Sequence, residues 1–247
     1  WLARLRGGMA IASVGACAMF SAASASSIAT AITIGAVAFP EMEKQKYDRG
    51  LATGVLAAGG TLGILIPPSG LLIIYGIITE QSIGELFRAG IIPGLCLTLL
   101  MMLTVFLRVW RKPALAPTAP SIPFREKLRV SRRSVDMVLL LVVVIVGIIV
   151  GWFTPTEAGA VGAFGAVVLS LLRRRLSWSG FKRAFIDTMK NTGLLFTIIV
   201  GAYVLNSFLA VSTIPMELAN WVESLGFPPI AVMVIIIAVY FILGCFI

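Results

Sequence analysis

Hydrophobic and polar positions alternate in long blocks along this chain, and most apolar blocks are about as long as one membrane crossing. A helix needs about 20 residues to span the hydrocarbon core of a bilayer. Apolar blocks near this length, bounded by polar segments, are residues 91–109, 135–152, 156–172, 192–210 and 229–247. This pattern predicts an all-α, polytopic membrane protein with little mass outside the bilayer.

The first apolar block, residues 7–40, has an unusual length. It carries no charge between Arg6 and Glu41, and it is too long for one crossing but too short for two crossings and a turn. Its centre, from Ser21 to Thr30, is a run of small and hydroxyl side chains, which suits the wall of a polar cavity better than a lipid-facing surface. We therefore predict a re-entrant helical hairpin with a serine-rich tip, a structure that holds polar groups inside a membrane.

The second block, residues 51–78, is long enough to cross the membrane but cannot form one regular helix. Four glycines precede the pair Pro67-Pro68. A proline donates no backbone hydrogen bond and disfavours helical geometry in the residue before it, so the carbonyl groups near Gly63 and Ile64 lose their partners. An unpaired carbonyl in hydrocarbon costs several kcal/mol. We therefore predict a helix that breaks within the membrane, with freed carbonyl groups that face another helix, water or a cation.

Composition and charge support the membrane assignment and the turn-back of the first block. The chain is 59% hydrophobic and 13% charged with a mean hydropathy of +1.01, whereas soluble domains are about half apolar and a quarter charged. The net charge of +9 resides in short loops, as expected for topology signals rather than for nucleic-acid binding. If residues 7–40 do not cross, all of the 20 Lys and Arg residues except Arg88 fall on one side. The positive-inside rule then makes that side cytoplasmic.

The remaining segments complete a map of two portions, residues 1–110 and 134–247. Residues 111–133 are rich in Pro, Arg and Lys and are predicted to form an exposed cytoplasmic linker. Residues 177–190 place aromatic side chains on one face and basic ones elsewhere, which predicts a helix in the membrane interface. Residues 216–225 are a second candidate for an interfacial helix.

A polar hairpin tip beside a helix interrupted at mid-membrane is the arrangement in which transporters hold coupling ions and substrates. Unwound carbonyl groups and helix C-termini face the cation, and helix N-termini face an anionic substrate. The oxygens offered here are neutral, because the nearest acids, Glu41 and Glu80, lie at the ends of the segments. Neutral oxygens suit Na⁺, whereas Ca²⁺ and Mg²⁺ normally require carboxylates and proton coupling requires a buried acid or histidine. We therefore expect Na⁺ as the coupling ion and no other cofactor.

Other candidate sites have simpler explanations. Thr154-Pro155-Thr156-Glu157 is an acidic motif near the membrane, but Thr154 as N-cap, Pro155 at the first helical position and Glu157 at the third predict a capping box with a structural role. The cysteines lie in apolar runs without the spacing of metal ligands or disulfides, so we expect packing roles. They are Cys17, Cys96 and Cys245.

Two functions of other classes stay open. An intramembrane enzyme would use a serine of the tip as nucleophile, but the chain has no histidine to activate it. A serine–lysine pair needs none, although every lysine is predicted to lie in a loop or interfacial segment. A channel is excluded less firmly, and saturable sodium-dependent uptake would separate a carrier from a pore.

Several motifs of the chain occur together in one known family. They are Arg6-Gly7-Gly8-Met9-Ala10, Ser24-Ala25-Ser26-Ser27-Ile28-Ala29-Thr30, Pro40-Glu41-Met42, Ala57-Ala58-Gly59-Gly60-Thr61-Leu62-Gly63-Ile64-Leu65-Ile66-Pro67-Pro68-Ser69, Ala89-Gly90-Ile91-Ile92-Pro93-Gly94 and Thr154-Pro155-Thr156-Glu157-Ala158. The glycine-to-diproline string is the most specific of them. With these motifs the chain resembles, over its whole length, the DctM-like large membrane subunit of tripartite ATP-independent periplasmic (TRAP) transporters.

The resemblance implies a fold of two inverted repeats, each with a hairpin and a broken helix in a mobile transport domain. It implies elevator-type import of small organic acids with Na⁺ across a bacterial inner membrane. The partners it implies are a small membrane subunit, separate or fused, and a periplasmic substrate-binding protein. It places the sodium ligands at the first hairpin and break, among Ser24, Ser26, Ser27, Gly59, Gly60, Thr61, Gly63 and Pro67. The substrate-binding candidates are Ser27, Thr30, Pro68 and Ser69.

The chain also departs from the family pattern. Ala25 stands where the family often has glycine in the tip, and Gly70-Leu71 follows the diproline where a bulkier pair is common. The chain ends where the second hairpin would begin, so we expect it to be part of a longer subunit with about half of the binding site, unable to transport alone. A stand-alone sodium–dicarboxylate symporter of related fold is the alternative of the same class.

Overall fold

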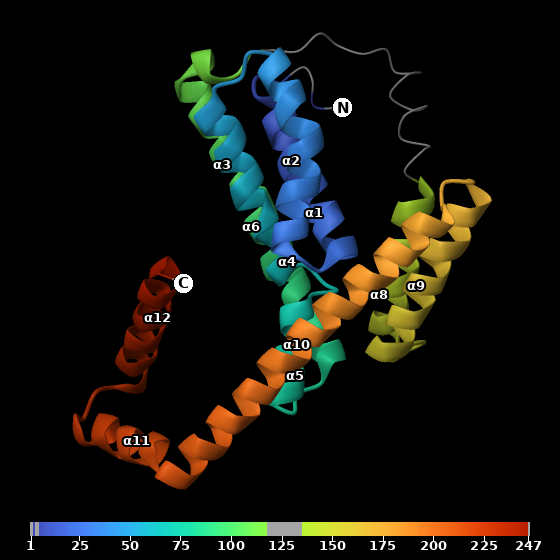
Figure 1. Ribbon diagram of the computed structural model, residues 1–247. Coiled ribbons are helices and arrows are strands. Elements are labelled where there is room, and N and C mark those ends of the chain that lie inside the picture. The colour runs from blue at the N-terminus through green and yellow to red at the C-terminus, as the bar shows by residue number, and fades with distance from the viewer. Residues whose placement is uncertain (1, 3–4, 118–134, 247) are drawn as a thin grey trace. The chain divides into compact units, whose positions relative to one another are not determined.

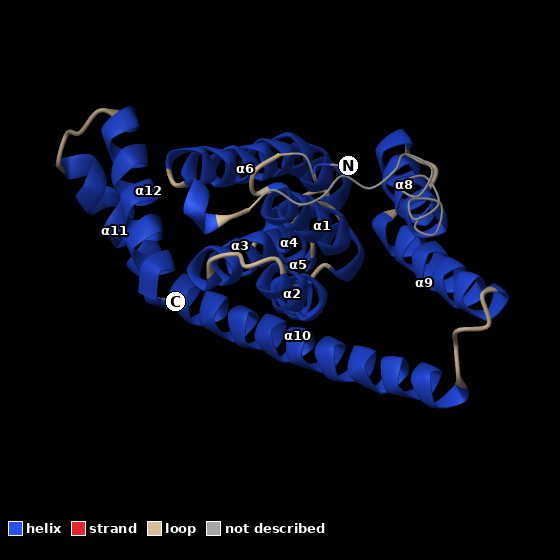
Figure 2. Ribbon diagram, turned by 90° about the horizontal axis from the view of Figure 1, so that it is seen from above, coloured by secondary structure: helices blue, strands red, loops and turns tan. Residues whose placement is uncertain are grey.

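The computed structural model describes residues 2, 5–117 and 135–246, and all regular structure in these residues is helical (Figure 2). This confirms the predicted all-α class for the described part of the chain. The helices labelled in Figure 1 and their neighbours are α1 (Gly8–Ser24), α2 (Ser27–Lys44), α3 (Arg49–Gly60), α4 (Leu62–Leu65), α5 (Gly70–Ile78), α6 (Ile83–Arg111), the 3-10 helix η2 (Pro113–Leu115), α8 (Val135–Val150), α9 (Pro155–Leu172), α10 (Trp178–Ser212), α11 (Ile214–Ser224) and α12 (Pro229–Phe246).

The chain divides into two compact units, Trp1–Ala184 and Phe185–Ile247, and α10 begins in the first unit and continues into the second. Four segments of the described residues have the length and apolar composition of membrane spans. They are Arg49–Ile78, Ile83–Arg111, Pro155–Leu172 and Trp178–Ser212. These helices support the assignment of the chain as a polytopic membrane protein.

In the first unit, α1, α2 and α3 pack against one another, and α4 and α6 also contact α1 (Figure 1). Side chains from these helices form one apolar core, in which Val14, Cys17, Met42 and Leu62 are almost completely buried. A polar side chain caps the start of α3, where the carboxylate of Asp48 accepts a hydrogen bond from the amide of Leu51. Burial of α1 on several sides explains why its sequence is apolar all round.

The first apolar block forms a helical hairpin, with α1 and α2 joined at Ala25 and Ser26. The second arm extends beyond the predicted end at residue 40 and continues to Lys44, with Pro40 inside the helix. Met42 is fully buried in the core, so packing favours continuation of the helix past the proline. Whether this hairpin turns back within the bilayer depends on its position in the membrane and stays a prediction.

The second block breaks where the prolines predicted it. Helix α3 ends at Gly60, α4 is a single turn, and α5 begins only at Gly70. The intervening residues 66–69 are not helical. A kinked but continuous helix is therefore excluded for this segment.

The two later hairpin arms, α8 and α9, pack against each other, and α6 contacts α8. A second apolar cluster joins these elements through Phe87, Val144, Ile148 and Ala158. The guanidinium of Arg88 donates to the carbonyl oxygen of Ile149 near the end of α8, which further ties α6 to this hairpin.

One predicted boundary in the second portion is wrong. We predicted a helix over 177–190 and a separate span over 192–210, but the structure has one continuous helix, α10. The polar residues Lys190, Asn191 and Thr192 at the expected boundary include no proline, so nothing there forces the helix to stop. The interfacial position of its first part stays a prediction. The predicted second interfacial segment and last span correspond to α11 and α12.

The linker predicted over 111–133 lies outside the described residues from 118 onward. Of its described beginning, residues 111–114 and 117 are exposed as predicted, whereas Ala116 is 0% exposed and the carbonyl oxygen of Leu115 accepts a hydrogen bond from the amide of Asp48 at 2.9 Å. The chain after α6 is thus held against the loop between α2 and α3.

Candidate functional site

The tip of the first hairpin is a two-residue turn built from opposite helix ends. Helix α1 ends at Ser24, and Ala25 follows in the left-handed region with φ 49°. Ser26 is the N-cap of α2, and its hydroxyl accepts a hydrogen bond from the amide of Ala29 at 3.3 Å. The C-terminus of α1 and the N-terminus of α2 therefore meet at one point, with partial negative and positive charge respectively.

Hydroxyl groups at the tip bond to one another. Ser24 Oγ lies 2.9 Å from Thr30 Oγ1, and Thr30 Oγ1 donates to the carbonyl oxygen of Ser26 at 2.8 Å. Thr30 is 0% exposed, whereas Ser24 and Ser26 are half-buried. Each hydroxyl oxygen has lone pairs beyond those used in these bonds, so the network is ordered and still able to accept further contacts.

The break after α3 is pressed against this tip. A Cβ atom at Gly60 would lie 2.9 Å from the carbonyl oxygen of Ser27 and 2.9 Å from Cβ of Ala31. A Cβ atom at Gly63 would lie 3.3 Å from backbone atoms of Ser26 and Ser27. At Gly60 only glycine allows this approach of two backbones, and at Gly63 a side chain would require its neighbours to shift. The structure thus brings together the two motifs that the sequence singled out.

One carbonyl group that loses its helical partner because of the diproline finds a new hydrogen-bond donor within the same segment. Pro68 cannot donate to the carbonyl oxygen of Ile64, and the hydroxyl of Ser69 donates to that oxygen instead at 2.6 Å. Ser69 is 0% exposed. No hydrogen bond to the carbonyl oxygen of Gly63 is found among the residues that the structure describes. Of the two carbonyl groups expected to lose partners, that of Ile64 therefore gains a local hydroxyl as its new partner, and that of Gly63 has no hydrogen bond among the described residues.

The start of α5 also lies at the tip. A Cβ atom at Gly70 would be 3.5 Å from the carbonyl oxygen of Ala25. The side chain of Ser69 is engaged with Ile64 and does not cap α5. The first amide groups of α5 therefore have no side-chain cap, which leaves a helix N-terminus beside the hairpin turn.

The remaining predicted site residues lie outside the hydroxyl network of the hairpin tip. Thr61 is exposed, and its hydroxyl donates to the carbonyl oxygen of Ala58 at 2.7 Å. Gly59 packs on Cys17, because a Cβ atom there would lie 2.8 Å from the sulfur. Pro67 is buried, and Pro68 lines a groove beside α8 and α9. Neither Thr61 nor Gly59 belongs to the hydroxyl network of the tip.

Two supporting residues were missed by the sequence reasoning. A Cβ atom at Gly90 of α6 would lie 2.9 Å from the carbonyl oxygen of Leu65, and one at Gly94 would lie 3.0 Å from the side chain of Ile66. These glycines let α6 lie directly against the broken segment. Their spacing of four residues, typical of close helix packing in membranes, was the signal available for this role.

The opposite end of the first hairpin is anchored by Tyr47 in the loop after α2. Its buried hydroxyl accepts a hydrogen bond from the amide of Met9 at 3.3 Å. Burial raises the pKa of the Tyr47 phenol, and the bond from Met9 opposes that effect. The phenol therefore stays neutral and holds the start of α1 against the loop.

The predicted capping box is present at the start of α9. The amide of Thr154 donates to the carboxylate of Glu157 at 2.8 Å, and the amide of Glu157 donates to the hydroxyl of Thr154 at 3.3 Å. Pro155 occupies the first turn. These groups satisfy one another, in agreement with a structural role.

Comparisons with known proteins extend over nearly the whole chain. The model of a family described as "Tripartite ATP-independent periplasmic transporter, DctM component" matches residues 2–247. The C4-dicarboxylate TRAP transporter large permease protein DctM of Pseudomonas aeruginosa is 38% identical over 245 residues, which are 98% of this chain and 56% of that protein. The ectoine/5-hydroxyectoine large permease protein UehC of Ruegeria pomeroyi is 34% identical over 249 residues, 99% of this chain and 57% of UehC.

A third relative is the sialic acid TRAP transporter large permease protein SiaM of Vibrio cholerae. It is 33% identical over 231 residues, which are 93% of this chain and 53% of SiaM. The chain thus spans about half the length of the curated relatives that it matches. The resemblance seen in the hairpin and diproline motifs is confirmed.

Proposed function

This chain belongs to the DctM component family of tripartite ATP-independent periplasmic transporters, and from this premise we propose that the full-length protein is the large permease subunit of a sodium-coupled importer of small organic acids. It is a multi-pass protein of the bacterial inner membrane, with its basic loops in the cytoplasm. It acts with a small membrane subunit, separate or fused, and with a periplasmic binding protein that delivers the substrate. Its homologues are transporter permeases, which argues against an enzyme.

The observation that carries the proposal is the contact between the hairpin tip and the helix break. Gly60 and Gly63 bring the end of α3 and the turn α4 against the backbone of Ser26 and Ser27. The contact gathers two helix N-termini, those of α2 and α5, and the C-termini of α1 and α3. Such a set of half-helix ends is the means by which transporters bind ions and organic anions at mid-membrane.

For Na⁺, the oxygens at the tip offer a neutral coordination set. The proposed ligands are the carbonyl oxygen of Gly63, whose residue packs on the backbone of Ser26 and Ser27, and the oxygens of Ser24, Ser26 and Ser27 at the tip. Thr30 orients Ser24 and Ser26 through its two hydrogen bonds. Neutral oxygens hold a monovalent cation weakly enough for its release in each transport cycle.

For the substrate, the N-termini of α2 and α5 attract negative charge. Ser27 and the start of α5 after Pro68 and Ser69 are the positions at which a carboxylate would bind. The names of the relatives include C4-dicarboxylate and sialic acid as transported compounds, and both carry a carboxylate. We propose an elevator-type movement of the hairpin and broken helix as one body, because their backbones are in direct contact.

The test is uptake of labelled organic acids into proteoliposomes that contain the full-length subunit and its small partner, with the binding protein added outside. An inward Na⁺ gradient is compared with choline. Uptake that requires both Na⁺ and the binding protein supports the proposal. Uptake that requires Na⁺ alone favours a stand-alone sodium–dicarboxylate symporter, and equal uptake in choline contradicts sodium coupling. Uptake that does not saturate indicates a channel.

Thr30→Val tests the sodium site directly. It keeps the shape of the side chain and removes both hydroxyl bonds, so we expect the Na⁺ concentration for half-maximal uptake to rise about tenfold. Thr98→Val is the matched control, because Thr98 is also buried and also donates at 2.8 Å to a carbonyl four residues earlier, that of Gly94. Equal sodium dependence in the two variants would remove Thr30 from the site.

A further inference from the structure

A groove of about 590 Å³ runs along α8 and α9 in the first unit. Its opposite side is formed by Ala22 and Ala23 near the end of α1 and by Pro68 of the broken helix. The volume is in the range of sites that hold small molecules, and none of the contacts described for the hairpin tip or the capping box fills the groove.

The two helices line this groove differently. Helix α8 contributes large apolar side chains such as Met137, Leu140 and Leu141, whereas α9 contributes a row of small residues. That row consists of Ala158, Gly159, Gly162, Ala163 and Ala166. From Ala158 to Ser170 the groove is roughly 18 Å long at about 1.5 Å per helical residue. One leaflet of a bilayer has a hydrocarbon depth of about 15 Å, so the groove matches an acyl chain in length and polarity.

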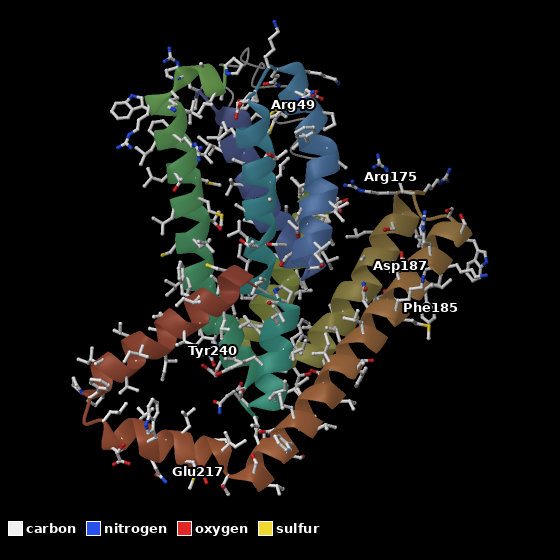
Figure 3. The ribbon with its side chains drawn as sticks, turned by 60° about the vertical axis from the view of Figure 1, so that its left-hand side comes forward. Arg49, Arg175, Phe185, Asp187, Glu217 and Tyr240 are labelled. Atoms are coloured by element: carbon white, nitrogen blue, oxygen red, sulfur yellow. The ribbon has the colours of Figure 1, made fainter. Side chains whose placement is uncertain are left out.

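One end of the groove is charged. Asp136, Arg173 and Arg175 line it there, and the guanidinium of Arg173 lies 2.5 Å from the carboxylate of Asp136. That pair is neutral as a whole. Arg174 and Arg175 follow at the end of α9, where Figure 3 labels Arg175, and neither forms an ion pair with any described residue. One positive charge without an ion-pair partner among the described residues, that of Arg175, therefore lies in the groove lining, and that of Arg174 follows Arg173 in the chain next to it.

We propose that this groove binds an anionic glycerophospholipid, with one acyl chain along α9 and the phosphate beside Arg174 and Arg175. Basic groups at the cytoplasmic membrane surface attract anionic head groups, and basic pockets between membrane helices bind them. A membrane helix would also fill the small-residue side of the groove, but an apolar helix brings no negative group to the arginines. Charge complementarity therefore favours the lipid, independently of the transport function proposed above.

The experiment is native mass spectrometry of the full-length protein in detergent, titrated with palmitoyl-oleoyl phosphatidylglycerol or with the corresponding phosphatidylcholine. Each surface arginine contributes about fivefold to the binding of anionic lipid. We therefore expect phosphatidylglycerol to bind about thirtyfold more tightly than phosphatidylcholine, and the Arg174→Gln/Arg175→Gln variant to lose this preference. Lys182→Gln/Arg183→Gln, which removes the same charge outside the groove lining, should keep it.

A second variant tests the apolar part. Gly159 lines the groove, and a Cβ atom added there would have no atom within 4 Å, so Gly159→Leu adds apolar bulk to the lining from an open position. We expect this substitution to weaken the binding of both lipids by about tenfold. Gly35→Leu, on an equally open helix face, should leave the binding of both lipids unchanged.

An unchanged lipid preference in the double arginine variant overturns the proposal. Labelling by a lipid with a photoreactive acyl chain must also fall on α8 or α9, and labelling only elsewhere, as when another helix fills the groove, contradicts it.

Discussion

The first unit contains two helical hairpins of similar size whose turns are built in opposite ways. The arms of the first have 17 and 18 residues, and the arms of the second have 16 and 18. In the second hairpin, Thr154 and Glu157 satisfy each other at an exposed turn. In the first, the turn at Ala25 and Ser26 lies against the break of another helix. Polar groups that are satisfied locally stabilise a hairpin, whereas those shared between distant segments create a place for a ligand.

The variant with the largest expected effect on the first hairpin changes Gly60, where the break contacts the tip. Gly60→Val would place an atom 2.9 Å from the backbone oxygen of Ser27, which can be relieved only by separation of the tip from the break. We expect a loss of about 3 kcal/mol in the free energy of unfolding, at the upper end for overpacked sites, and loss of sodium-dependent uptake. Thermal unfolding in detergent and proteoliposome uptake measure the two effects.

Gly54→Val is the control for that substitution. Gly54 lies on the same helix, α3, and an added Cβ atom there would have no atom within 4 Å. The substitution Gly54→Val therefore introduces the same β-branched side chain into the helix without a clash of its Cβ atom. If the two variants have the same stability and uptake, the close approach at Gly60 has no functional meaning.

Ser69→Ala tests the local replacement of a lost hydrogen bond at the break. The variant leaves the carbonyl oxygen of Ile64 without a partner, and we expect a loss of about 1–2 kcal/mol in the free energy of unfolding. Ser21→Ala is the matched control. Ser21 is also fully buried and donates to the carbonyl oxygen of Ala18 at 2.8 Å, but that oxygen lies within α1 and keeps its helical amide partner. A loss in Ser21→Ala as large as in Ser69→Ala would contradict the role assigned to the break.

Much of this architecture is predictable from local chemistry. The diproline prevents helix formation wherever it lies, so the break between α4 and α5 follows from Pro67 and Pro68 alone. The capping box at Thr154 is equally local. The close contact of tip and break was expected only from their shared polarity, and the glycines that permit it act through space on residues more than thirty positions away, as Gly60 does on Ser27.

The features that were missed depend on tertiary packing. Burial of Met42 stabilises the continuation of α2 past Pro40, and the sequence of residues 40–44 does not predict this continuation. Likewise, the sequence offered Ser69 only as a candidate for substrate binding, and the folded chain adds a structural role, because its hydroxyl donates to the carbonyl oxygen of Ile64. Sequence patterns identify which groups lose their partners, whereas only the folded chain decides which neighbour replaces them.

Thr154→Ala tests the self-contained hairpin. Loss of the cap is expected to lower the free energy of unfolding by about 1 kcal/mol and to leave the sodium dependence of uptake unchanged, because the turn lies outside the tip and the break. Thr156→Ala, two residues along the same exposed turn, is the control, since no side-chain hydrogen bond of Thr156 is found among the described residues. Thermal unfolding and the Na⁺ concentration for half-maximal uptake are the two readouts. A change in sodium dependence on loss of the cap would show that the second hairpin also shapes the ion site.

The smallest test exchanges glycine and alanine between the two turns. Ala25 and Gly151 each follow the first arm of a hairpin with positive φ, 49° and 85° respectively, a conformation that favours glycine. Relief of strain in Ala25→Gly is partly offset by the greater freedom of glycine in the unfolded chain, so we expect a gain of about 0.5 kcal/mol in the free energy of unfolding. Gly151→Ala, in open space, should lose a similar amount, and the double variant should unfold near the temperature of the unmodified protein because distant sites are additive. A loss of stability in Ala25→Gly would mean that the methyl group of Ala25 contributes packing at the tip that outweighs its backbone strain.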